Sequence, residues 1–330
     1  MQSFRAFRIH SDGGKVVPRL ETLTLDDLAP GEVVIKVDYS TINFKDALAV
    51  TGAGKILRKY PLVAGIDLAG SVVSSSDAAL NPGQKVVVTG CGLSETHDGG
   101  YAEYARVKSD WVVPIPAGLD PYQCMALGTA GFTAALAIHQ MERNGQAPES
   151  GEIVVTGATG GVGSLAIDML AGRGYRAVAV TGKQDAQKYL QSIGASRVLL
   201  REAIAPGSRP LEEAQWAGAI DNVGGDLLTW LTRTTNFFGN IASIGMAGSV
   251  DLKSTVLPFI LRGVNLLGIN SVFTPRPLRL AVWQRLASDL KPQHLDRIVT
   301  QTIGFEQLPA AFDDYMKRNV TGRTVVRIAG

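Results

Sequence analysis

The chain has 330 residues, of which 45% are hydrophobic and 19% charged, and its formal net charge is +2. A chain of this length exceeds the usual limit for one hydrophobic core, so two domains are expected. The nearly balanced charge, without a basic block, argues against a nucleic-acid or membrane-surface partner. Two cysteines, Cys91 and Cys124, offer no disulfide framework and suggest a reducing compartment.

The start of the chain does not resemble a signal peptide. Residues 1–9 alternate polar and apolar side chains like a strand and lack a continuous apolar core. The longest mostly apolar run, residues 125–138, is too short to cross a bilayer and contains Gly and Thr. We therefore expect a soluble, cytoplasmic protein.

The first part of the chain, residues 1–124, is rich in short strands and turns. Strands are predicted over 32–37, 68–73 and 85–88, and the turn sequences Pro30-Gly31 and Asn81-Pro82-Gly83 stand close to them. This texture indicates an all-β, barrel-like domain.

From residue 125 to 273 the pattern changes to alternating strands and helices, which is typical of a parallel sheet. A helical run over 122–141 leads into this part. The predicted strands are 153–155, 176–181, 197–200, 218–222, 240–244 and 266–269, and the predicted helices between them include 185–193 and 225–235. The remainder, 274–330, contains predicted helices over 277–290 and 308–318 and a closing strand over 324–328.

The most informative stretch is Ile153-Val154-Val155 followed by Thr156-Gly157-Ala158-Thr159-Gly160-Gly161-Val162-Gly163. A buried strand is followed by a glycine-rich turn and by apolar residues at helical spacing. Glycines let the chain turn sharply, let the backbone approach a pyrophosphate and let the helix pack on the strand. The helix N-terminus offers N–H groups and a positive dipole end to the phosphates. The sequence therefore predicts a dinucleotide-binding domain.

The end of the second strand of this domain indicates which dinucleotide is bound. NAD-selective domains place Asp or Glu about 20 residues after the glycine turn to bind the ribose 2′-hydroxyl. Here Thr181, Gly182 and Lys183 follow the strand, and no carboxylate occurs before Asp185. A hydroxyl and a cation suit a 2′-phosphate, and Arg197 is a candidate second cation. NADPH is favoured over NADH, although Lys183 alone could be a solvated loop residue.

Several blocks in a fixed order resemble the medium-chain dehydrogenase/reductase superfamily over the whole chain, most closely its acrylyl-CoA reductase subfamily of zinc-free, quinone oxidoreductase-like enzymes. The matching segments are 43–48 (NFKDAL), 65–70 (GIDLAG), 128–134 (GTAGFTA), 216–221 (WAGAID) and 258–262 (PFILR). The resemblance implies an α/β fold with two domains. These are a GroES-like β-barrel catalytic domain, residues 1–124 plus 274–330, and a Rossmann domain with a doubly wound parallel sheet, residues 125–273, that binds NADPH.

The superfamily contains zinc enzymes and zinc-free enzymes, and the sequence places this chain with the second group. The resemblance puts Asn43, Ile66 and Thr129 where zinc relatives have ligands, and none of these is a good ligand for zinc. Two cysteines cannot form a four-cysteine structural lobe. Cys91 and His97 form a Cys/His neighbourhood that is better explained as ordinary loop residues. We therefore expect no metal.

Without zinc there is no Lewis acid to polarise a ketone, so the acceptor must already be activated. A C=C bond conjugated to a carbonyl accepts hydride at its β carbon, and an enolate forms. The resemblance implies reduction of acrylyl-CoA to propionyl-CoA. Two alternatives stay open: an NADPH:quinone or small-enone oxidoreductase, and a non-catalytic NADPH-binding sensor. Basic residues Lys45, Lys55, Arg58 and Lys59 are candidates for the phosphates of a CoA carrier.

Roles are expected for the following cofactor contacts. The pyrophosphate is assigned to Thr159, Gly160, Gly161 and Val162. The nicotinamide end is assigned to Thr133, by family position, and to Gly245, Ile269 and Ser271 at strand ends. Arg323 resembles a family arginine that reaches the cofactor phosphates, with a surface salt bridge as the alternative.

Asn43 and Asp46 are the candidate catalytic residues. Asn43 is expected to donate to the substrate carbonyl or to the nicotinamide ribose, and Asp46 either acts in catalysis or holds its loop. The subfamily usually has tyrosine at the position of Phe44, a cofactor contact, so the obvious proton donor is missing. The edge strand 266–269 pairs across a two-fold axis in relatives, so a homodimer is expected.

Overall fold

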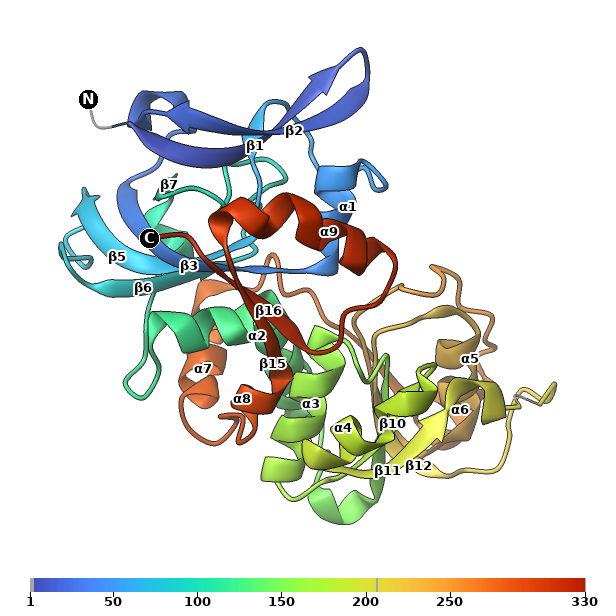
Figure 1. Cartoon of the computed structure of the whole chain (residues 1–330). Coiled ribbons are helices and arrows are strands. Elements are labelled where there is room, and N and C mark those ends of the chain that lie inside the picture. Colours follow the sequence, from blue (N-terminus) through green and yellow to red (C-terminus); the bar gives the residue numbers. More distant parts are fainter. Residues whose placement is uncertain (1–2, 206, 330) are drawn as a thin grey trace. The chain divides into compact units, whose positions relative to one another are not determined.

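The computed structural model describes residues 3–205 and 207–329, which divide into two compact units (Figure 1). The first unit comprises Met1–Thr129, Val272–Trp283 and Val299–Gly330, and the second comprises Ala130–Ser271 and Gln284–Ile298. The expected domain boundaries differ from this division in three segments. Residues 125–129 and 272–273 belong to the first unit, and residues 284–298 belong to the second.

The first unit is built from two sheets, as the strand-and-turn pattern predicts. The larger sheet has the order β15-β16-β3-β5-β6-β8, with β7 also paired to β3, and the smaller has the order β2-β1-β4. The strands are β1 (Phe4–Asp12), β2 (Lys15–Leu23), β3 (Val33–Ile42), β4 (Leu62–Val63), β5 (Asp67–Ser75), β6 (Lys85–Thr89), β7 (Tyr104–Val107), β8 (Val113–Pro114), β15 (Val299–Gly304) and β16 (Arg323–Arg327).

Two helices close the apolar core of the first unit. Helix α1 (Phe44–Thr51) packs against α9 (Leu308–Met316) and against β2 of the smaller sheet. Alternate residues of the strands, such as Val33, Ile35 and Val37, are buried because successive side chains of a strand point to opposite faces. The C-terminal strand β16 pairs antiparallel with β3, so the end of the chain completes the sheet that begins near its start.

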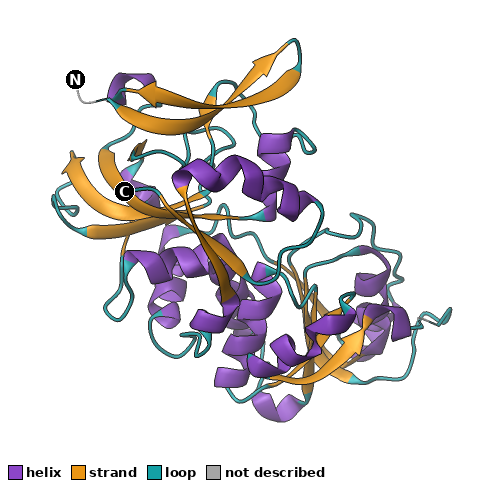
Figure 2. Ribbon diagram, viewed as in Figure 1, coloured by secondary structure: helices purple, strands orange, loops and turns teal. Residues whose placement is uncertain are grey.

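The second unit has a six-stranded parallel sheet of order β11-β10-β9-β12-β13-β14. This is the doubly wound order 3-2-1-4-5-6, in which the strand order reverses between β9 and β12. Helices flank the sheet (Figure 2). The strands are β9 (Glu152–Thr156), β10 (Arg176–Thr181), β11 (Ala195–Leu200), β12 (Trp216–Asp221), β13 (Thr235–Ser243) and β14 (Asn265–Gly268), and the helices are α3 (Gly161–Gly172), α4 (Gln187–Ser192), α5 (Gly225–Thr234), α6 (Leu257–Arg262) and α8 (Leu295–Ile298).

Two further helices, α2 (Pro121–Arg143) and α7 (Arg276–Leu286), match the predicted runs 122–141 and 277–290. Helix α2 is interrupted at Gly128, whose φ of 53° and ψ of −156° are not helical. This left-handed value of φ is accessible to glycine at little steric cost. The interruption lies directly before Thr129, and it shapes the candidate site described next.

Candidate active site

The polar centre of the first unit is the carboxylate of Asp67 at the start of β5. It is fully buried and accepts three hydrogen bonds. Its Oδ2 accepts from Asn43 Nδ2 at 2.8 Å and from the backbone N–H of Thr129 at 2.9 Å. Its Oδ1 accepts from the Thr129 hydroxyl at 2.5 Å. Burial raises the pKa of Asp67, although these hydrogen bonds and the charge of Arg323 oppose the increase.

Asn43 precedes α1 and joins Asp67 to a second buried carboxylate, Asp46. One N–H of the Asn43 side chain donates to Asp67, and the other donates to Asp46 Oδ2 at 3.1 Å. Its Oδ1 accepts from Arg323 Nη1 at 3.2 Å. Because every donor of the side-chain amide is used within the protein, Asn43 does not have the free N–H that the expected contact with a substrate carbonyl requires. The geometry indicates a positioning role.

Asp46 lies in the first turn of α1 and is fully buried. Its Oδ2 accepts from the backbone N–H of Asn43 at 2.8 Å, and its Oδ1 accepts from the N–H of Ile66 at 2.9 Å. The carboxylate thereby ties the start of α1 to the residue before Asp67. Burial and the nearby charge of Asp67 raise the pKa of Asp46 to about 7. Of the two expected roles for Asp46, the contacts favour holding its loop.

Arg323 does not reach outward to cofactor phosphates as the resemblance implies. Its side chain is 2% exposed. Nε donates to Ala126 O at 3.1 Å, Nη1 donates to Ile42 O and to Asn43 Oδ1, each at 3.2 Å, and Nη2 donates to Thr41 Oγ1 at 2.7 Å. A buried guanidinium needs such partners because desolvation without them is costly. The expectation is corrected on this geometry: Arg323 is a buried clamp of the first unit.

Gly128 makes room for this cluster. A Cβ atom at this position would lie 2.7 Å from Arg323 Nη2 and 2.8 Å from Asp67 Oδ2. Both distances are below those that real Cβ atoms adopt. The interruption of α2 therefore allows the guanidinium, the carboxylate and the N–H of Thr129 to meet at one point.

The cluster does not fit a zinc ion. Asp67 is the carboxylate at its centre, and Asn43 and Thr129 contribute hydrogen-bond donors to it rather than metal ligands. The Asn43 carbonyl oxygen is also unavailable to a metal, because it accepts a hydrogen bond from the guanidinium of Arg323. Within residues 3–205 and 207–329, no group of three or more His, Cys, Asp or Glu side chains is arranged to hold a metal. His97 is buried and its ring nitrogens lie 3.1 Å from the carbonyl oxygens of Asp98 and Pro30.

The second unit carries the glycine-rich turn at the switch between β9 and β12. Helix α3 begins at Gly161, so its first backbone N–H groups lack helical partners. A Cβ at Gly163 would lie 2.4 Å from Gly157 O and 2.8 Å from Ala158 Cα, so glycine is required for the helix to pack on the turn. The predicted pyrophosphate residues, Thr159, Gly160, Gly161 and Val162, all lie in this turn and at the start of α3.

The end of β10 carries the predicted 2′-phosphate residues. Thr181 ends the strand, and its hydroxyl accepts from the backbone N–H of Lys183 at 3.0 Å. Burial lowers the pKa of Lys183, against the raising effect of nearby Asp185. Arg201, which follows β11, lies beside Gly182, because a Cβ atom at Gly182 would be 3.7 Å from Arg201 Cζ. Arg201 is exposed.

Arg197, the expected second cation, lies elsewhere. Its Nη2 bonds Glu152 Oε2 at 2.8 Å, and its guanidinium stands 5.4 Å from the centre of the Trp216 ring. Glu152 begins β9 and Trp216 begins β12, so Arg197 points to the amino ends of the parallel strands, whereas cofactors bind outside their carboxyl ends. Its role is corrected accordingly, and Arg201 is the cation on the side where the phosphate is expected.

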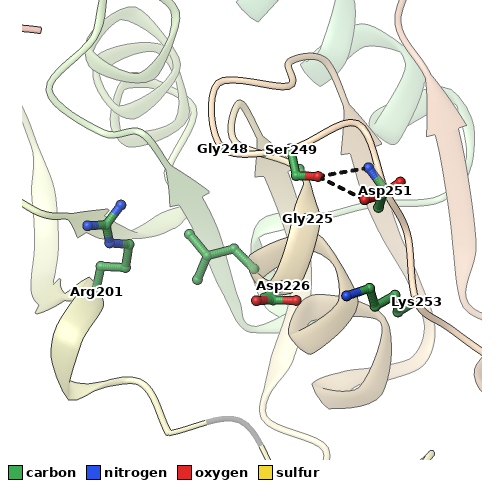
Figure 3. A pocket seen from close by; sticks show the side chains of 9 residues that line it. Arg201, Gly225, Asp226, Gly248, Ser249, Asp251 and Lys253 are labelled. Atoms are coloured by element: carbon green, nitrogen blue, oxygen red, sulfur yellow. Dashed lines mark hydrogen bonds between the residues drawn. The ribbon is translucent and has the colours of Figure 1, made fainter.

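A pocket of about 360 Å³ extends from Arg201 along the carboxyl ends of the strands of the second unit. Arg201 lines one side, and Asp226, Asp251 and Lys253 line the other (Figure 3). The Ser249 hydroxyl lies 3.3 Å from Asp251 Oδ2, which orders the loop after β13. The remaining lining residues are Gly224, Gly225, Leu227, Gly248 and Ser249.

The other predicted cofactor residues are placed as follows. Thr133 is buried in α2, and Ile269, whose N–H donates to Ser243 O at 3.1 Å, follows β14 with Ser271. Gly245 follows β13, and a Cβ there would lie 2.4 Å from Asn222 O. Phe44 opens α1 in the first unit and is 40% exposed, which is unusual for so large an apolar side chain.

Sequence reasoning did not identify Asp67 and Arg201 as site residues. Asp67 stands within the matching block 65–70, so its position was visible but its role was not. Arg201 follows a predicted strand, and the rule that ligands bind at carboxyl ends of parallel strands could have identified it.

No helix in residues 3–205 and 207–329 combines the length and apolar character needed to cross a membrane.

Comparison with known proteins supports the fold and the family. Residues 29–117 match the family described as "Alcohol dehydrogenase GroES-like domain", and residues 161–287 match "Zinc-binding dehydrogenase". The chain is 45% identical over 326 residues to "Putative quinone oxidoreductase YhfP" of Bacillus subtilis, covering 98% of this chain and 99% of the relative. It is also 45% identical over 328 residues to "Acrylyl-CoA reductase AcuI" of Ruegeria pomeroyi, with the same coverage.

Two solved structures are similar over nearly the whole chain. The Bacillus subtilis YhfP structure with NAD bound has a TM-score of 0.97 at 45% identity, covering 99% of this chain and all of that chain. The Escherichia coli YhdH structure with bound NADPH has a TM-score of 0.94 at 45% identity, covering 98% of this chain and all of that chain. With full-length similarity at this level, and a β unit combined with a doubly wound parallel sheet, the chain belongs to the medium-chain dehydrogenase/reductase superfamily of oxidoreductases.

Proposed function

We propose that the protein uses NADPH to reduce an activated C=C bond, with acrylyl-CoA as the substrate and propionyl-CoA as the product. The observation that carries this proposal is the full-length identity of 45% with an acrylyl-CoA reductase. The donor set around Asp67 supports it, because Asn43 and Thr129, which the resemblance puts at zinc-ligand positions, donate hydrogen bonds to Asp67, and the guanidinium of Arg323 bonds Asn43. An already conjugated acceptor needs no Lewis acid.

The adenosine end of the cofactor is proposed to lie at the end of β10 and in the adjoining pocket. Lys183 and Arg201 would bind the 2′-phosphate, and Thr181, Gly182 and Lys183 occupy the strand end where NAD-selective domains place a carboxylate. The pocket beside Arg201 has the size and mixed polarity to accept the adenine. Relatives of this chain have been solved with NADP or NADPH and with NAD, so the choice between NADPH and NADH calls for a kinetic test on this protein.

The remaining cofactor contacts keep their predicted assignments. Thr159, Gly160, Gly161 and Val162 would bind the pyrophosphate through backbone N–H groups at the start of α3. Thr133, Gly245, Ile269 and Ser271 would border the nicotinamide, and the exposed ring of Phe44 would contact the cofactor. When bound, the reduced nicotinamide supplies a hydride for the β carbon of the substrate.

Recognition of the CoA carrier would depend on exposed cations close to α1. Lys45 is excluded from this set because it forms an ion pair with Glu95. Lys55, Arg58 and Lys59 are exposed, and their charges would attract the carrier phosphates. Contacts with the remote carrier can improve orientation at the reacting carbon.

The decisive experiment compares steady-state turnover with acrylyl-CoA, free acrylate and a benzoquinone, each with NADPH. We expect kcat/KM to be much higher for acrylyl-CoA than for acrylate, and the difference should shrink as added salt screens the phosphates. The alternative, a quinone or small-enone reductase, is favoured by the equal similarity to YhfP, which is described as a putative quinone oxidoreductase. Efficient quinone reduction with no NADPH oxidation by acrylyl-CoA would establish it instead.

We also propose that the reaction needs no metal, which the same donor set supports. Purified protein should contain no stoichiometric zinc by elemental analysis, and prolonged chelation should leave the rate of acrylyl-CoA reduction unchanged. Near one zinc per chain, lost together with activity, would contradict the proposal.

A homodimer is proposed through β14, which ends the six-stranded sheet. Around this strand Phe237, Phe238, Ile260 and Leu266 are exposed apolar residues. Pairing of two such edges would cover them. Sedimentation of wild-type protein and of Leu266→Lys tests this: a dimer is expected for the first and a shift toward monomer for the second.

A further inference from the structure

The reduction of a C=C bond needs a proton for the α carbon after hydride has reached the β carbon. Phe44 carries no hydroxyl, so it cannot give this proton. The hydroxyl of Thr129 bonds a buried carboxyl of the polar cluster of the first unit, and Thr129 as a residue is partly exposed. Its bond to Asp67 is 2.5 Å between the two oxygens, with the hydroxyl as the donor. When the Asp67 carboxyl is protonated, it can donate to the Thr129 oxygen instead, and the hydroxyl hydrogen can then point to another acceptor.

The hydrogen bonds around the two carboxyl groups restrict where a proton can reside. Oδ2 of Asp67 accepts two N–H groups, and Oδ2 of Asp46 also accepts two. A proton on either group must therefore lie on Oδ1. On Asp67 this atom faces the Thr129 hydroxyl, and on Asp46 it accepts from the N–H of Ile66 on the buried side.

The charges around the pair favour one shared proton. The two carboxyl groups are joined by the Asn43 amide, and both are fully buried. Like charges at such short range resist joint ionisation. Other titratable groups are close enough to interact electrostatically with one or both carboxyl groups: Arg323, Arg279, Cys91, Tyr101 and Tyr315. Arg279 Nη1 donates to Thr89 O and Oγ1 on β6, the strand next to β5.

We propose that the Thr129 hydroxyl delivers the proton to the α carbon and that Asp67 replaces it, with Asn43 and Asp46 as positioning residues. This inference rests on the proposed alkene reduction. Hydride from NADPH adds to the β carbon and leaves an enolate. The Thr129 O–H bond breaks as the α C–H bond forms, and the Thr129 oxygen takes the proton from Asp67 Oδ1. The carboxyl pair has then lost one proton, which water restores after the product leaves.

The stereochemistry of the product tests this step. In D₂O, acrylyl-CoA becomes propionyl-CoA with one deuterium on the α carbon, which makes that carbon stereogenic. A proton delivered by a fixed hydroxyl reaches one face, so the wild type should give a single configuration. Thr129→Val keeps the shape of the side chain and removes the hydroxyl. It should give a mixture and slow acrylyl-CoA reduction on the order of 100-fold.

Two variants and one second acceptor act as controls. Thr129→Ser retains the hydroxyl and should keep the single configuration. Thr51→Val removes the hydroxyl that bonds Ala47 O at the other end of α1, and it should change neither rate nor configuration. Benzoquinone reduction should be much less affected by Thr129→Val, because hydroquinone oxygens take their protons directly from water.

The possible failures are distinguishable. A wild type that oxidises no NADPH with acrylyl-CoA would remove the proposed function and this inference together. A wild type that turns over acrylyl-CoA but labels both faces equally would overturn only this inference. This measurement uses wild-type protein alone, so it does not depend on whether a variant folds. A single configuration retained by Thr129→Val at the wild-type rate would also overturn it.

Discussion

Two arginines of this protein have opposite surroundings. In the first unit, Arg323 is 2% exposed, and its N–H groups donate to Ala126, Ile42, Asn43 and Thr41. In the second unit, Arg201 is exposed beside Gly182 and lines a pocket. A guanidinium whose donors are used inside the fold stabilises that fold, whereas one that faces a pocket can bind a phosphate. The residue type is the same, and the surroundings decide its role.

The same distinction separates the two candidate site regions. The polar groups around Asp67 form hydrogen bonds with one another, which fixes their positions. Asn43 and Thr129 are the partly exposed residues among them, and Thr129 carries the hydroxyl. The N–H groups at the start of α3 lie at the switch point of a parallel sheet, where an anion can be received. The following variants test whether this contrast is real.

The largest expected effect is the loss of Arg323. Arg323→Met should lower the free energy of unfolding by about 3–5 kcal/mol, because it leaves buried oxygens of Ala126, Ile42, Asn43 and Thr41 without their donor and removes the positive charge that acts on Asp67. Urea or thermal denaturation measures this. The matched control is Arg327→Met on the same strand, whose side chain is exposed and whose loss should change stability by less than about 0.5 kcal/mol. Equal effects in the two variants would contradict the clamp role.

The second effect is a dependence of the free energy of unfolding on pH, which arises from Asp46. Its pKa of about 7 in the folded protein lies above the value in an unfolded chain. The folded state therefore binds more protons than the unfolded chain between about pH 4 and 7. Consequently this group lowers the free energy of unfolding as pH rises through that window, by on the order of 2–4 kcal/mol.

Denaturation curves between pH 5 and 8 measure this slope, and the infrared carbonyl band of a protonated buried carboxyl should disappear over the same range. In Asp46→Asn the contribution to the slope should vanish. A protein whose infrared band is absent already at pH 5 would show that Asp46 is ionised throughout.

The third effect concerns cofactor affinity. Lys183→Asp should raise KM for NADPH at least tenfold, equivalent to about 1.4 kcal/mol, because it places a negative charge beside the 2′-phosphate. Arg201→Met should act in the same direction. Neither change should affect KM for NADH comparably, and both should leave stability nearly unchanged. Wild-type protein that uses NADH as efficiently as NADPH would contradict the assignment of both residues.

The smallest effect is expected at Arg197. Its ion pair with Glu152 is exposed, so Arg197→Met should lower stability by less than about 1 kcal/mol. KM for NADPH should not change, because the side chain points to the amino ends of the strands. A rise in KM comparable to that of Arg201→Met would restore the role first expected for Arg197.

The fold could be predicted largely from local patterns. The glycine turn, the strand spacing and the alternation with helices indicate the parallel sheet, because each pattern reflects a local backbone or packing requirement. Strand β15 has the polar sequence Thr300-Gln301-Thr302 at its centre and shows no such pattern. It is a strand because its backbone pairs with β16, and this pairing cannot be predicted from the local sequence.

The roles of site residues were harder to predict than the fold. The orientation of the Asn43 side-chain amide depends on Arg323, which lies 280 residues later in the sequence and donates a hydrogen bond to the Asn43 carbonyl oxygen. Asp46 and Asp67 consume the N–H groups of the same amide. The segment 43–48 contains Asp46 but does not reveal Asp67 or Arg323, since these come from two other parts of the chain.

The interruption of α2 at Gly128 also limits how this protein can be stabilised. In an unbroken helix, the N–H of Thr129 would bond the carbonyl of Met125. Here it bonds Asp67 instead, so the chain exchanges one helical hydrogen bond for one to a carboxylate. Replacing glycine by alanine usually strengthens a helix. At Gly128 the added Cβ would collide with the Asp67 carboxylate and the Arg323 guanidinium. The replacement would therefore lower the stability of the protein even though it favours a continuous helix.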